Sequence, residues 1–439
     1  MHHRLGRLLA VATIMLLFVG LPVFAGGQDE AQPEGPVDIV VWGWPAADVA
    51  FESIIEGFNE LYPDINVIWE MSETAAVHDS LTAAIAAGTG APDISMIEIN
   101  YIDQFALFGG LTDLLQEPFD AGRYEDQFVE YKWEQATTLE GDQLVAFPWD
   151  IGPATVFYRR DLFDAAGVPS DPESVAELLS TWEGYVETGR LVNDPDNNVY
   201  WTDQAGNIPY IYHSHKNLFD EELNVAIDNP DTRAALEIAK ILRNEGMDLN
   251  VDFWTEEWYS ALNEGRVATT IVGSWFGGFL KSWIAADTAG NWGIAPVPEH
   301  PLQNWGGSFL AIPEQSDNKE AAWAFIEYSM ASAEPQNAIF EAVDYFPAYK
   351  PAWEDDLYET GDPFFGGQPT RALWTEIATA QGKFITTPLD AAAEAAFTAE
   401  VTTFLEQNLT VDEAIARAER AIIEQIGQDR EMLRQRMGN

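Results

Sequence analysis

The chain has 439 residues, a formal charge of −50 from 72 acidic and 22 basic side chains, and no cysteine. The lack of cysteine excludes disulfides, thiolate metal sites, thiol nucleophiles and a lipid on an N-terminal thiol. The acidic excess argues against nucleic acid and anionic lipid as partners. With 47% hydrophobic residues and 16 tryptophans, a chain of this length predicts two well-packed domains.

The first 25 residues have the features of a secretory signal peptide. Arg4 and Arg7 precede an apolar stretch at 8–19, and residues 23–25 (VFA) form a small-x-small cleavage pattern. Because this stretch is shorter than the roughly 18 to 20 residues that span a bilayer, we expect cleavage after residue 25 and no membrane insertion afterwards. Residues 26–36 are polar and rich in Pro and Gly, which predicts a flexible tether.

The next segment predicts a parallel sheet. Strand patterns at 39–42, 65–71 and 93–99 alternate with helical patterns at 51–61 and 74–87. A βαβαβ order implies right-handed crossovers, with ligands at the carboxyl ends of the strands. Those ends carry two short segments, Trp42-Gly43-Trp44 and residues 98–101.

Later elements are marked less regularly. Strand patterns at 144–147 and 155–158 flank a kinked Pro148-Trp149-Asp150, helical patterns dominate 174–263, and 267–272 is a strand that ends near Trp275. The C-terminal helix begins at a capping box formed by Thr410 and Glu413.

Signatures of catalysis and of metal binding are absent from the sequence. No Gly-x-Ser-x-Gly motif or phosphate-binding loop occurs. His213-x-His215 lacks an identifiable third ligand, and the acidic turn at 194–205 lacks the Gly and Glu of a calcium loop. We therefore expect no metal and no cofactor. Among 72 acids no spacing singles out a pair of glycosidase carboxylates.

The placement of tryptophan is more informative. Flat apolar rings stack on the C–H faces of sugars, while sugar hydroxyls need hydrogen-bond partners such as carboxylates and amides. Five tryptophans lie beside Gly or Pro at predicted strand ends: Trp42, Trp44, Trp149, Trp275 and Trp305.

From residue 37 to the C-terminus, the order of short motifs resembles the extracellular solute-binding proteins of carbohydrate ABC importers, the group that contains maltose- and trehalose-binding proteins. The motifs are 91–94 (APDI), 147–150 (FPWD), 156–163 (VFYRRDLF), 261–268 (ALNEGRVA), 273–275 (GSW), 295–298 (APVP), 305–308 (WGGS), 311–313 (AIP) and 321–326 (AAWAFI).

The resemblance implies an α/β, two-lobed periplasmic binding protein fold of type II, in which each lobe is a sheet flanked by helices and hinge crossovers join the lobes. Crossings are expected near Trp149, Thr269 and Met330. Lobe 1 would then comprise 37–149 and 270–330, and lobe 2 would comprise 150–269 and 331–439.

The resemblance also implies a ligand site. Glu98 matches a position where relatives often carry a sugar-binding carboxylate, and Trp275 matches a stacking aromatic. Asp150 fits the first acid of a Pro-Trp-Asp-x-Asp pattern, but Gly152 replaces the second. The full expected set is Trp42, Trp44, Glu98, Asn100, Tyr101, Trp149, Asp150, Trp254, Trp275, Trp305, Gly306 and Tyr345.

The resulting expectation is a non-enzymatic, monomeric periplasmic receptor without a lipid anchor. It would bind a sugar or oligosaccharide and deliver it to membrane permease subunits. Two alternatives stay open: a receptor for a cation such as a polyamine or betaine, which aromatic cages also suit, and a secreted glycosidase. Which of Trp42 and Trp44 faces the ligand is also open.

Overall fold

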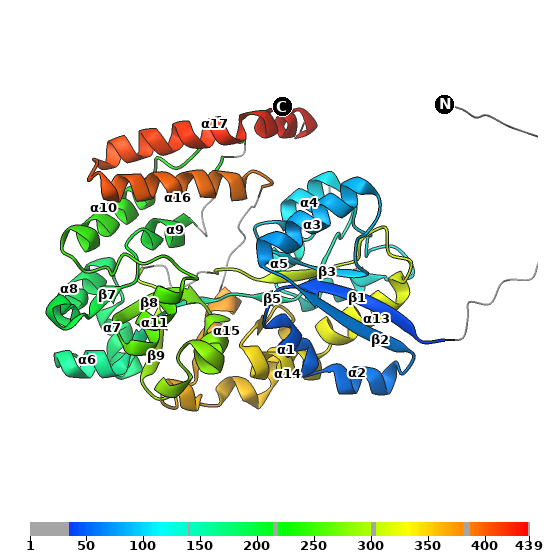
Figure 1. Cartoon of the computed structure of the whole chain (residues 1–439), viewed down its shortest axis with the longest axis horizontal. Coiled ribbons are helices and arrows are strands. Elements are labelled where there is room, and N and C mark those ends of the chain that lie inside the picture. The colour runs from blue at the N-terminus through cyan, green and yellow to red at the C-terminus, as the bar shows by residue number, and fades with distance from the viewer. Residues whose placement is uncertain are drawn as a thin grey trace, which may run out of the picture. The chain divides into compact units, whose positions relative to one another are not determined.

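The computed structural model describes residues 35–138, 141–213, 218–220, 222–299, 304–380 and 387–437. The expected signal peptide, most of the expected tether and His215 lie outside the described residues. Residues from Pro36 onward form one compact unit whose described part contains a five-stranded sheet, a four-stranded sheet and a two-stranded pair (Figure 1).

The first sheet has the strand order β2-β1-β3-β10-β4. Its strands are β1 (Val37–Gly43), β2 (Ile65–Met71), β3 (Ile94–Glu98), β10 (Ser308–Ala311) and β4 (Phe147–Pro148). β1 pairs in parallel with β2 and β3, whereas β10 is antiparallel to β3 and β4. The predicted βαβαβ unit is thus confirmed.

The first crossover contains a helix break that the periodicity did not reveal. The single helix expected at 51–61 is two helices, α1 (Ala47–Glu52) and α2 (Ile55–Leu61), followed after β2 by α3 (Thr74–Ala87). The Ser53 hydroxyl donates to the Ala50 carbonyl at 2.6 Å. A serine that bonds to a backbone carbonyl in this way competes with regular helical hydrogen bonding.

The second sheet has the order β7-β8-β6-β9. It comprises β7 (Tyr200–Thr202), β8 (Val267–Gly273), β6 (Ala154–Arg159) and β9 (Trp292–Pro296). Every residue of β6 and β8 is buried, as expected of strands covered on both faces. Because β8 and β9 both pair with β6, residues 270–296 belong with the second sheet and not with lobe 1 as expected.

The chain passes between the sheets at 148–153, at 304–308 and at 345–348. The short strands β5 (Asp150–Ile151) and β11 (Phe346–Pro347) pair with each other, and Pro153 bridges to Asn304. The predicted crossing between lobes near Thr269 was wrong, because Thr269 lies inside β8. Met330 ends a helix of the first core, so the third passage comes later than expected.

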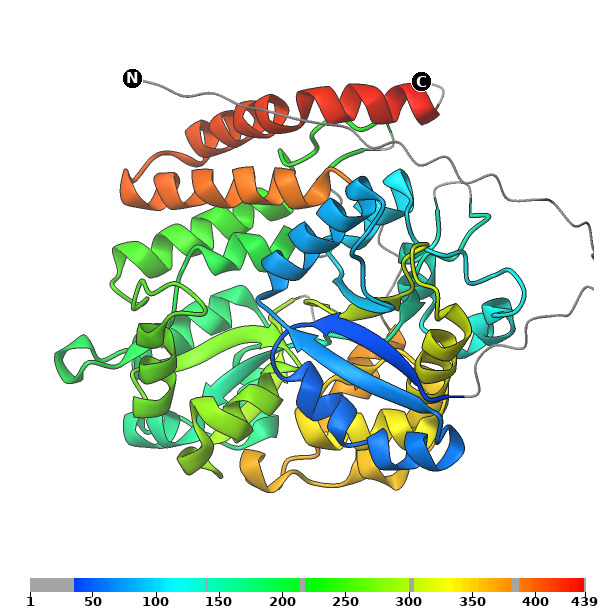
Figure 2. The ribbon, with the colours of Figure 1, turned by 45° about the vertical axis from the view of Figure 1, so that its right-hand side comes forward.

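The two C-terminal helices and α10 (Pro230–Asn244) stack beside the second sheet, and we call these three helices the C-terminal layer. α10, α16 (Asp390–Glu406) and α17 (Val411–Met437) contact one another, and both views show α16 and α17 side by side (Figures 1 and 2). The predicted capping box is confirmed: Thr410 N donates to Glu413 Oε2 at 2.9 Å, and Glu413 N donates to Thr410 Oγ1 at 3.3 Å.

Further α-helices complete the described part of the fold. They are α4 (Ile102–Phe108), α5 (Glu130–Gln135), α6 (Arg160–Ala166), α7 (Pro172–Leu178), α8 (Trp182–Val192), α9 (Asn207–His213), α11 (Glu256–Glu264), α12 (Phe276–Phe279), α13 (Lys319–Met330), α14 (Ala333–Val343) and α15 (Thr370–Ala380). Within the described ranges, no helix combines the length and apolar character needed to cross a membrane.

Candidate functional site

A lysine and two carboxylates form a buried group at one end of the first sheet. Glu98 ends β3 and lies in register with Ser308, the first residue of β10, while Asp150 begins β5 just past β4. Lys132 comes from α5. All three residues adjoin Gly307: a Cβ there would lie 2.9 Å from Lys132 Nζ and 2.6 Å from the Asp150 carbonyl oxygen, and Ile99, next to Glu98, donates to the Gly307 carbonyl at 3.0 Å. We call Glu98, Lys132 and Asp150 the polar cluster.

Lys132 is the most unusual member of the polar cluster. Its side chain is wholly buried, and its ammonium lies 3.6 Å from the centroid of the Phe309 ring. No described residue hydrogen-bonds to Lys132 Nζ. Burial lowers the pKa of Lys132, and the Asp150 and Glu98 carboxylates oppose that shift.

The two carboxylates respond to the same burial in the opposite direction. Burial raises the pKa of Glu98 to about 7, although Asn100 N donates to its Oε2 at 2.8 Å. Burial also raises the pKa of Asp150, against the attraction of Lys132 and hydrogen bonds from Ser308. Asp150 Oδ1 has no hydrogen-bond partner among the described residues. The cluster therefore presents an unsatisfied donor and an unsatisfied acceptor in one buried place.

The His78 imidazole contacts both the end of β3 and two aromatic rings. The Glu98 backbone N–H donates to His78 Nε2 at 3.0 Å, so the imidazole proton resides on Nδ1 and is donated to the Thr74 carbonyl at 2.7 Å. Burial lowers the pKa of His78 to about 4. Tyr101 stacks on the imidazole at 3.8 Å between ring centroids, and Trp44 stacks on it at 5.8 Å.

Trp42 and Trp44 have different surroundings. Trp42 lies on the face of β1 opposite to the buried Val41, and its Nε1 donates to Glu70 at 2.9 Å in an exposed position. Trp44 packs against the core and stacks on His78. The structure thus brings Trp44 to the group around Glu98 and keeps Trp42 apart from it.

Three tryptophans, Trp254, Trp275 and Trp305, form an aromatic cluster. Trp275 and Trp254 are stacked with centroids 5.7 Å apart, and Trp275 meets Trp305 edge-to-face at 6.4 Å. Trp275 Nε1 donates to the Trp305 carbonyl at 2.8 Å. That hydrogen bond fixes the ring orientation of Trp275.

Two glycines connect the aromatic cluster with the polar cluster. Gly306 and Gly307 have φ values of 88° and 118°, which side-chain-bearing residues rarely adopt. A Cβ on Gly306 would lie 2.9 Å from Trp275 Nε1, and one on Gly307 would lie 2.9 Å from Lys132 Nζ. The aromatic cluster and the polar cluster therefore lie on either side of the backbone at Gly306 and Gly307.

The surroundings of Gly152 explain why the second acid of the Pro-Trp-Asp-x-Asp pattern is missing. A Cβ at this position would lie 2.8 Å from the Trp305 carbonyl carbon and 3.1 Å from Trp275 Nε1. Gly152 N donates to Asn304 Oδ1 at 2.7 Å, and Trp305 N donates to Gly152 O at 2.6 Å. This backbone packing leaves no room for the second acid.

A third acid faces the polar cluster from the C-terminal layer. The Tyr210 ring lies 5.1 Å from the Trp305 ring between centroids, and the Glu394 carboxylate on α16 acts on the pKa of Tyr210. Burial, followed by repulsion from Glu98, raises the pKa of Glu394 to about 8. Elements of both sheets thus supply polar groups to the same region.

Two expected site residues belong largely to the core. The Trp149 ring is wholly buried between Phe51, at 4.9 Å, and Tyr345, at 5.4 Å, so it offers no face to a ligand. Its Nε1 nevertheless lacks a partner among the described residues. Tyr345 is buried as well, and Asn100 is exposed beside Glu98.

Sequence reasoning missed four residues of this region: His78, Lys132, Tyr210 and Glu394. Lys132 carried a usable signal, since it is a rare basic residue flanked by Tyr131 and Trp133. Glu394 stands alone in an alanine-rich stretch at 391–396. In the described ranges, no group of three or more potential metal ligands occurs.

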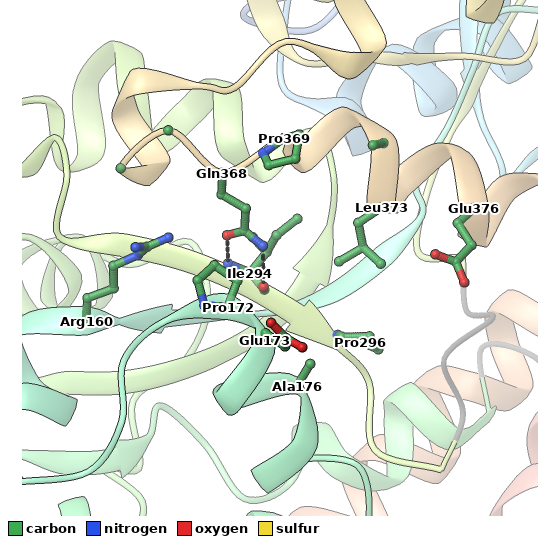
Figure 3. Close-up of a pocket in the computed structure, with 13 residues that line it drawn as sticks. Arg160, Pro172, Glu173, Ala176, Ile294, Pro296, Gln368, Pro369, Leu373 and Glu376 are labelled. Atoms are coloured by element: carbon green, nitrogen blue, oxygen red, sulfur yellow. Dashed lines mark hydrogen bonds between the residues drawn. The ribbon is translucent and has the colours of Figure 1, made fainter.

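A separate pocket of about 570 Å³ lies between β9, α7 and α15 (Figure 3). The Gln368 amide closes one edge of it by accepting from Ile294 N at 2.9 Å and donating to Ile294 O at 2.8 Å. Arg160 and Glu376 line its two ends in the figure. None of the expected site residues lines this pocket.

Comparisons with known proteins agree with the fold. The profile of the family described as "Bacterial extracellular solute-binding protein" matches residues 53–363. The arabinooligosaccharide-binding protein of Halalkalibacterium halodurans is 25% identical over 76% of this chain and 76% of its own length. The lactose-binding protein of Rhizobium radiobacter is 27% identical, covering 78% of this chain and 81% of its own.

A solved structure extends the comparison to three dimensions. The ABC transporter associated binding protein of B. animalis subsp. lactis Bl-04, in complex with β-1,6-galactobiose, matches with a TM-score of 0.73 and 25% identity. The alignment covers 89% of this chain and 97% of that one. The relatives found are binding proteins, not enzymes.

Proposed function

The chain belongs to the bacterial extracellular solute-binding proteins, and from this premise we propose that it binds a sugar or oligosaccharide between its two lobes and delivers it to the permease of an ABC importer. The protein acts without catalytic chemistry, as a monomer exported by residues 1–25 to the periplasm and not lipidated there. The ligand contacts are Glu98, Asp150 and Lys132 together with Trp44, Tyr101, Trp275 and Trp305.

One observation carries this proposal. Lys132 Nζ and Asp150 Oδ1 are buried without hydrogen-bond partners among the described residues. Unsatisfied buried polar atoms cost roughly 1 to 3 kcal/mol each, so they persist where a ligand completes them. A sugar hydroxyl both donates and accepts, and can satisfy an ammonium and a carboxylate at once. The neighbouring Trp275 supplies the face on which a sugar ring stacks.

The charge of the polar cluster favours a neutral ligand over a cation. A polyamine or betaine would bring positive charge to a buried lysine, and like charges repel strongly where water is excluded. Burial moves the pKa of Glu98 up to about 7 and that of Lys132 down to about 7, so burial disfavours charge on both side chains and the cluster offers little net attraction to a cation. A neutral polyol chain avoids both costs.

A thermal-shift panel tests the proposal. The chain from residue 26 onward is melted with arabino-oligosaccharides, lactose, maltotriose, mannitol, spermidine and glycine betaine. A ligand that binds only the folded state raises the melting temperature, by linkage. We expect one carbohydrate class to do so. Stabilisation by spermidine or betaine alone would contradict the proposal, as would release of shorter sugars from any oligosaccharide incubated with the purified protein.

A matched pair of variants localises the binding. Trp275→Ala should abolish the carbohydrate shift, because it removes the stacking face, and should leave the apo melting temperature nearly unchanged. Trp42→Ala serves as the control, since Trp42 lies apart from the polar cluster with its Nε1 on Glu70. Equal loss of the shift in both variants would place the binding elsewhere.

A further inference from the structure

Aromatic contacts continue beyond Trp275, away from the polar cluster. The Phe279 ring lies 5.8 Å from Trp275, Trp283 lies 6.2 Å from Phe279, and Tyr259 lies 4.7 Å from Trp283, all between ring centroids. We call Phe279, Trp283 and Tyr259 the outer strip. It comes from α11, from α12 and from the turn that follows α12, so it extends the aromatic cluster without a break.

Two rings of this row, Trp283 in the outer strip and its neighbour Trp254, are exposed, whereas Phe279 and Tyr259 are half-buried. Trp283 is 53% exposed and Trp254 is 50% exposed, whereas every other tryptophan in the described ranges is buried or half-buried. Scattered exposed apolar residues need no explanation, but these two belong to one connected row of rings. Exposed rings that are joined to one another through a half-buried ring form an apolar patch, and such patches often bind a ligand or partner.

The backbone holds this surface in an unusual way. Trp254 has φ 64°, a left-handed conformation that costs a bulky residue about 1 kcal/mol or more. Trp283 lies in a π-helical turn, Leu280–Ile284, and such turns occur frequently at functional sites. The turn buries Leu280 and Ile284 in the core while its Trp283 ring is exposed to solvent, and the left-handed backbone at Trp254 likewise leaves that ring exposed.

Carboxylates border the outer strip from both lobes. Burial raises the pKa of Tyr259, and the negative charges of Glu256 on α11 and of Glu73, in the turn before α3, raise it further. Glu73 belongs to the crossover of the first sheet, whereas Tyr259 belongs to a helix beside the second. A carboxylate of the first crossover and one of α11 therefore both act on a ring of the outer strip.

We propose that the outer strip binds further units of an oligosaccharide whose first units occupy the site at Trp275, so that the protein selects chains longer than a disaccharide. This inference rests on the proposed function. Continuity with the Trp275 stacking face and the bordering carboxylates favours a sugar chain as the occupant. A partner protein on the same surface is the competing outcome.

Calorimetric titration with two series of defined length tests the inference: maltose to maltopentaose, and arabinobiose to arabinopentaose. In the series that binds, the wild-type affinity should rise by at least tenfold from the disaccharide to the tetrasaccharide. Trp283→Ala should lower the affinity for the tetrasaccharide at least tenfold and that for the disaccharide less than twofold. Trp283→Phe should retain most of the tetrasaccharide affinity.

Phe108→Ala is the matched control, because Phe108 is an exposed aromatic residue outside the connected row, and it should change neither affinity. Equal affinity for all lengths, with no effect of Trp283→Ala, would overturn the inference and leave the proposed function intact. Impaired transport by a permease in vesicles with unaltered sugar affinity would also overturn it, in favour of a protein partner. Failure of every sugar to bind would refute the proposed function itself.

Discussion

Two buried aspartates, Asp203 and Asp150, differ in how completely their oxygens are satisfied. Asp203 Oδ2 accepts from Thr270 Oγ1 at 2.6 Å and Trp258 Nε1 at 3.1 Å, and its Oδ1 accepts from Gln204 N at 2.8 Å. Asp150 is equally buried, yet its Oδ1 has no partner among the described residues. Burial raises the pKa of both carboxyls.

The difference separates a structural role from a binding role. The donors around Asp203 come from β8, α11 and the segment after β7, so this carboxylate ties three elements of the second lobe together. Asp150 lies where the chain passes between lobes, beside a lysine that also lacks a partner. A buried acid with all of its hydrogen bonds made stabilises a fold, whereas one left incomplete is suited to a ligand.

Asp203→Ala should produce the largest effect on stability. The substitution leaves buried donors on Thr270 and Trp258 unpaired, which predicts a loss of about 3 kcal/mol in the free energy of unfolding. Urea unfolding monitored by tryptophan fluorescence measures it. A loss below about 1 kcal/mol would show that the Asp203 network does not carry the structural role assigned to it.

Asp150→Asn should weaken sugar binding and leave the stability of the apo protein nearly unchanged. No described donor is left unpaired at Oδ1, so the apo free energy of unfolding should change by less than about 1 kcal/mol. The affinity for the sugar identified by the thermal-shift panel should fall at least tenfold, about 1.4 kcal/mol, because a charged acceptor is lost. Calorimetry on the variant checks the affinity, and unaltered binding would remove Asp150 from the ligand site.

Glu394→Gln should change how the free energy of unfolding depends on pH. The pKa of Glu394 is raised to about 8 from an ordinary value of 4.5, so folding favours the protonated form. The carboxyl therefore reduces stability progressively as pH rises from about 5 to about 8. The stability of the variant relative to wild type should increase between pH 6.5 and 8.5, as measured by urea unfolding at both values.

The range above pH 6.5 also avoids interference from His78. The pKa of His78 is lowered to about 4, so the stability linked to this residue is lost only as pH falls below about 6.5. A difference between Glu394→Gln and wild type that stays constant from pH 6.5 to 8.5 would contradict a raised pKa at Glu394.

Trp42→Leu should have the smallest effect. Its indole hydrogen bond to Glu70 is exposed, and exposed polar contacts contribute roughly 0.5 kcal/mol or less. The melting temperature and the sugar affinity should both stay close to wild type. Trp44→Leu, in contrast, should weaken sugar binding, because Trp44 packs against His78 next to Glu98. If Trp42→Leu alone weakened binding, the assignment of the two tryptophans would be reversed.

Local signals predicted the regular parts of the fold. Strand patterns, alternating only in β2, identified β1 to β3, and the pair Thr410 and Glu413 identified the start of α17. The assignment of residues 270–296 to the first lobe failed, because sheet membership depends on which distant strand β8 and β9 pair with. No short-range pattern encodes that pairing.

The candidate site was predictable where a motif marked it and unpredictable where it depends on the folded environment. Glu98, Asp150, Trp275 and Trp305 follow recognisable segments, and the structure brings them into one region. Lys132 and His78 gain their unusual properties from burial among residues far away in the chain. Trp149 shows the reverse: its motif suggested a ligand contact, but Phe51 and Tyr345 enclose its ring.

The contact of Gly152 with the Trp305 carbonyl also constrains how this receptor can change. A single substitution cannot restore an acid at position 152, because the side chain would collide with the neighbouring crossing segment. The segment at 304–307 would have to move at the same time, and it carries Trp305 and orients Trp275. Charge and aromatic stacking in this site are therefore linked, so an altered ligand preference at one requires a coordinated change at the other.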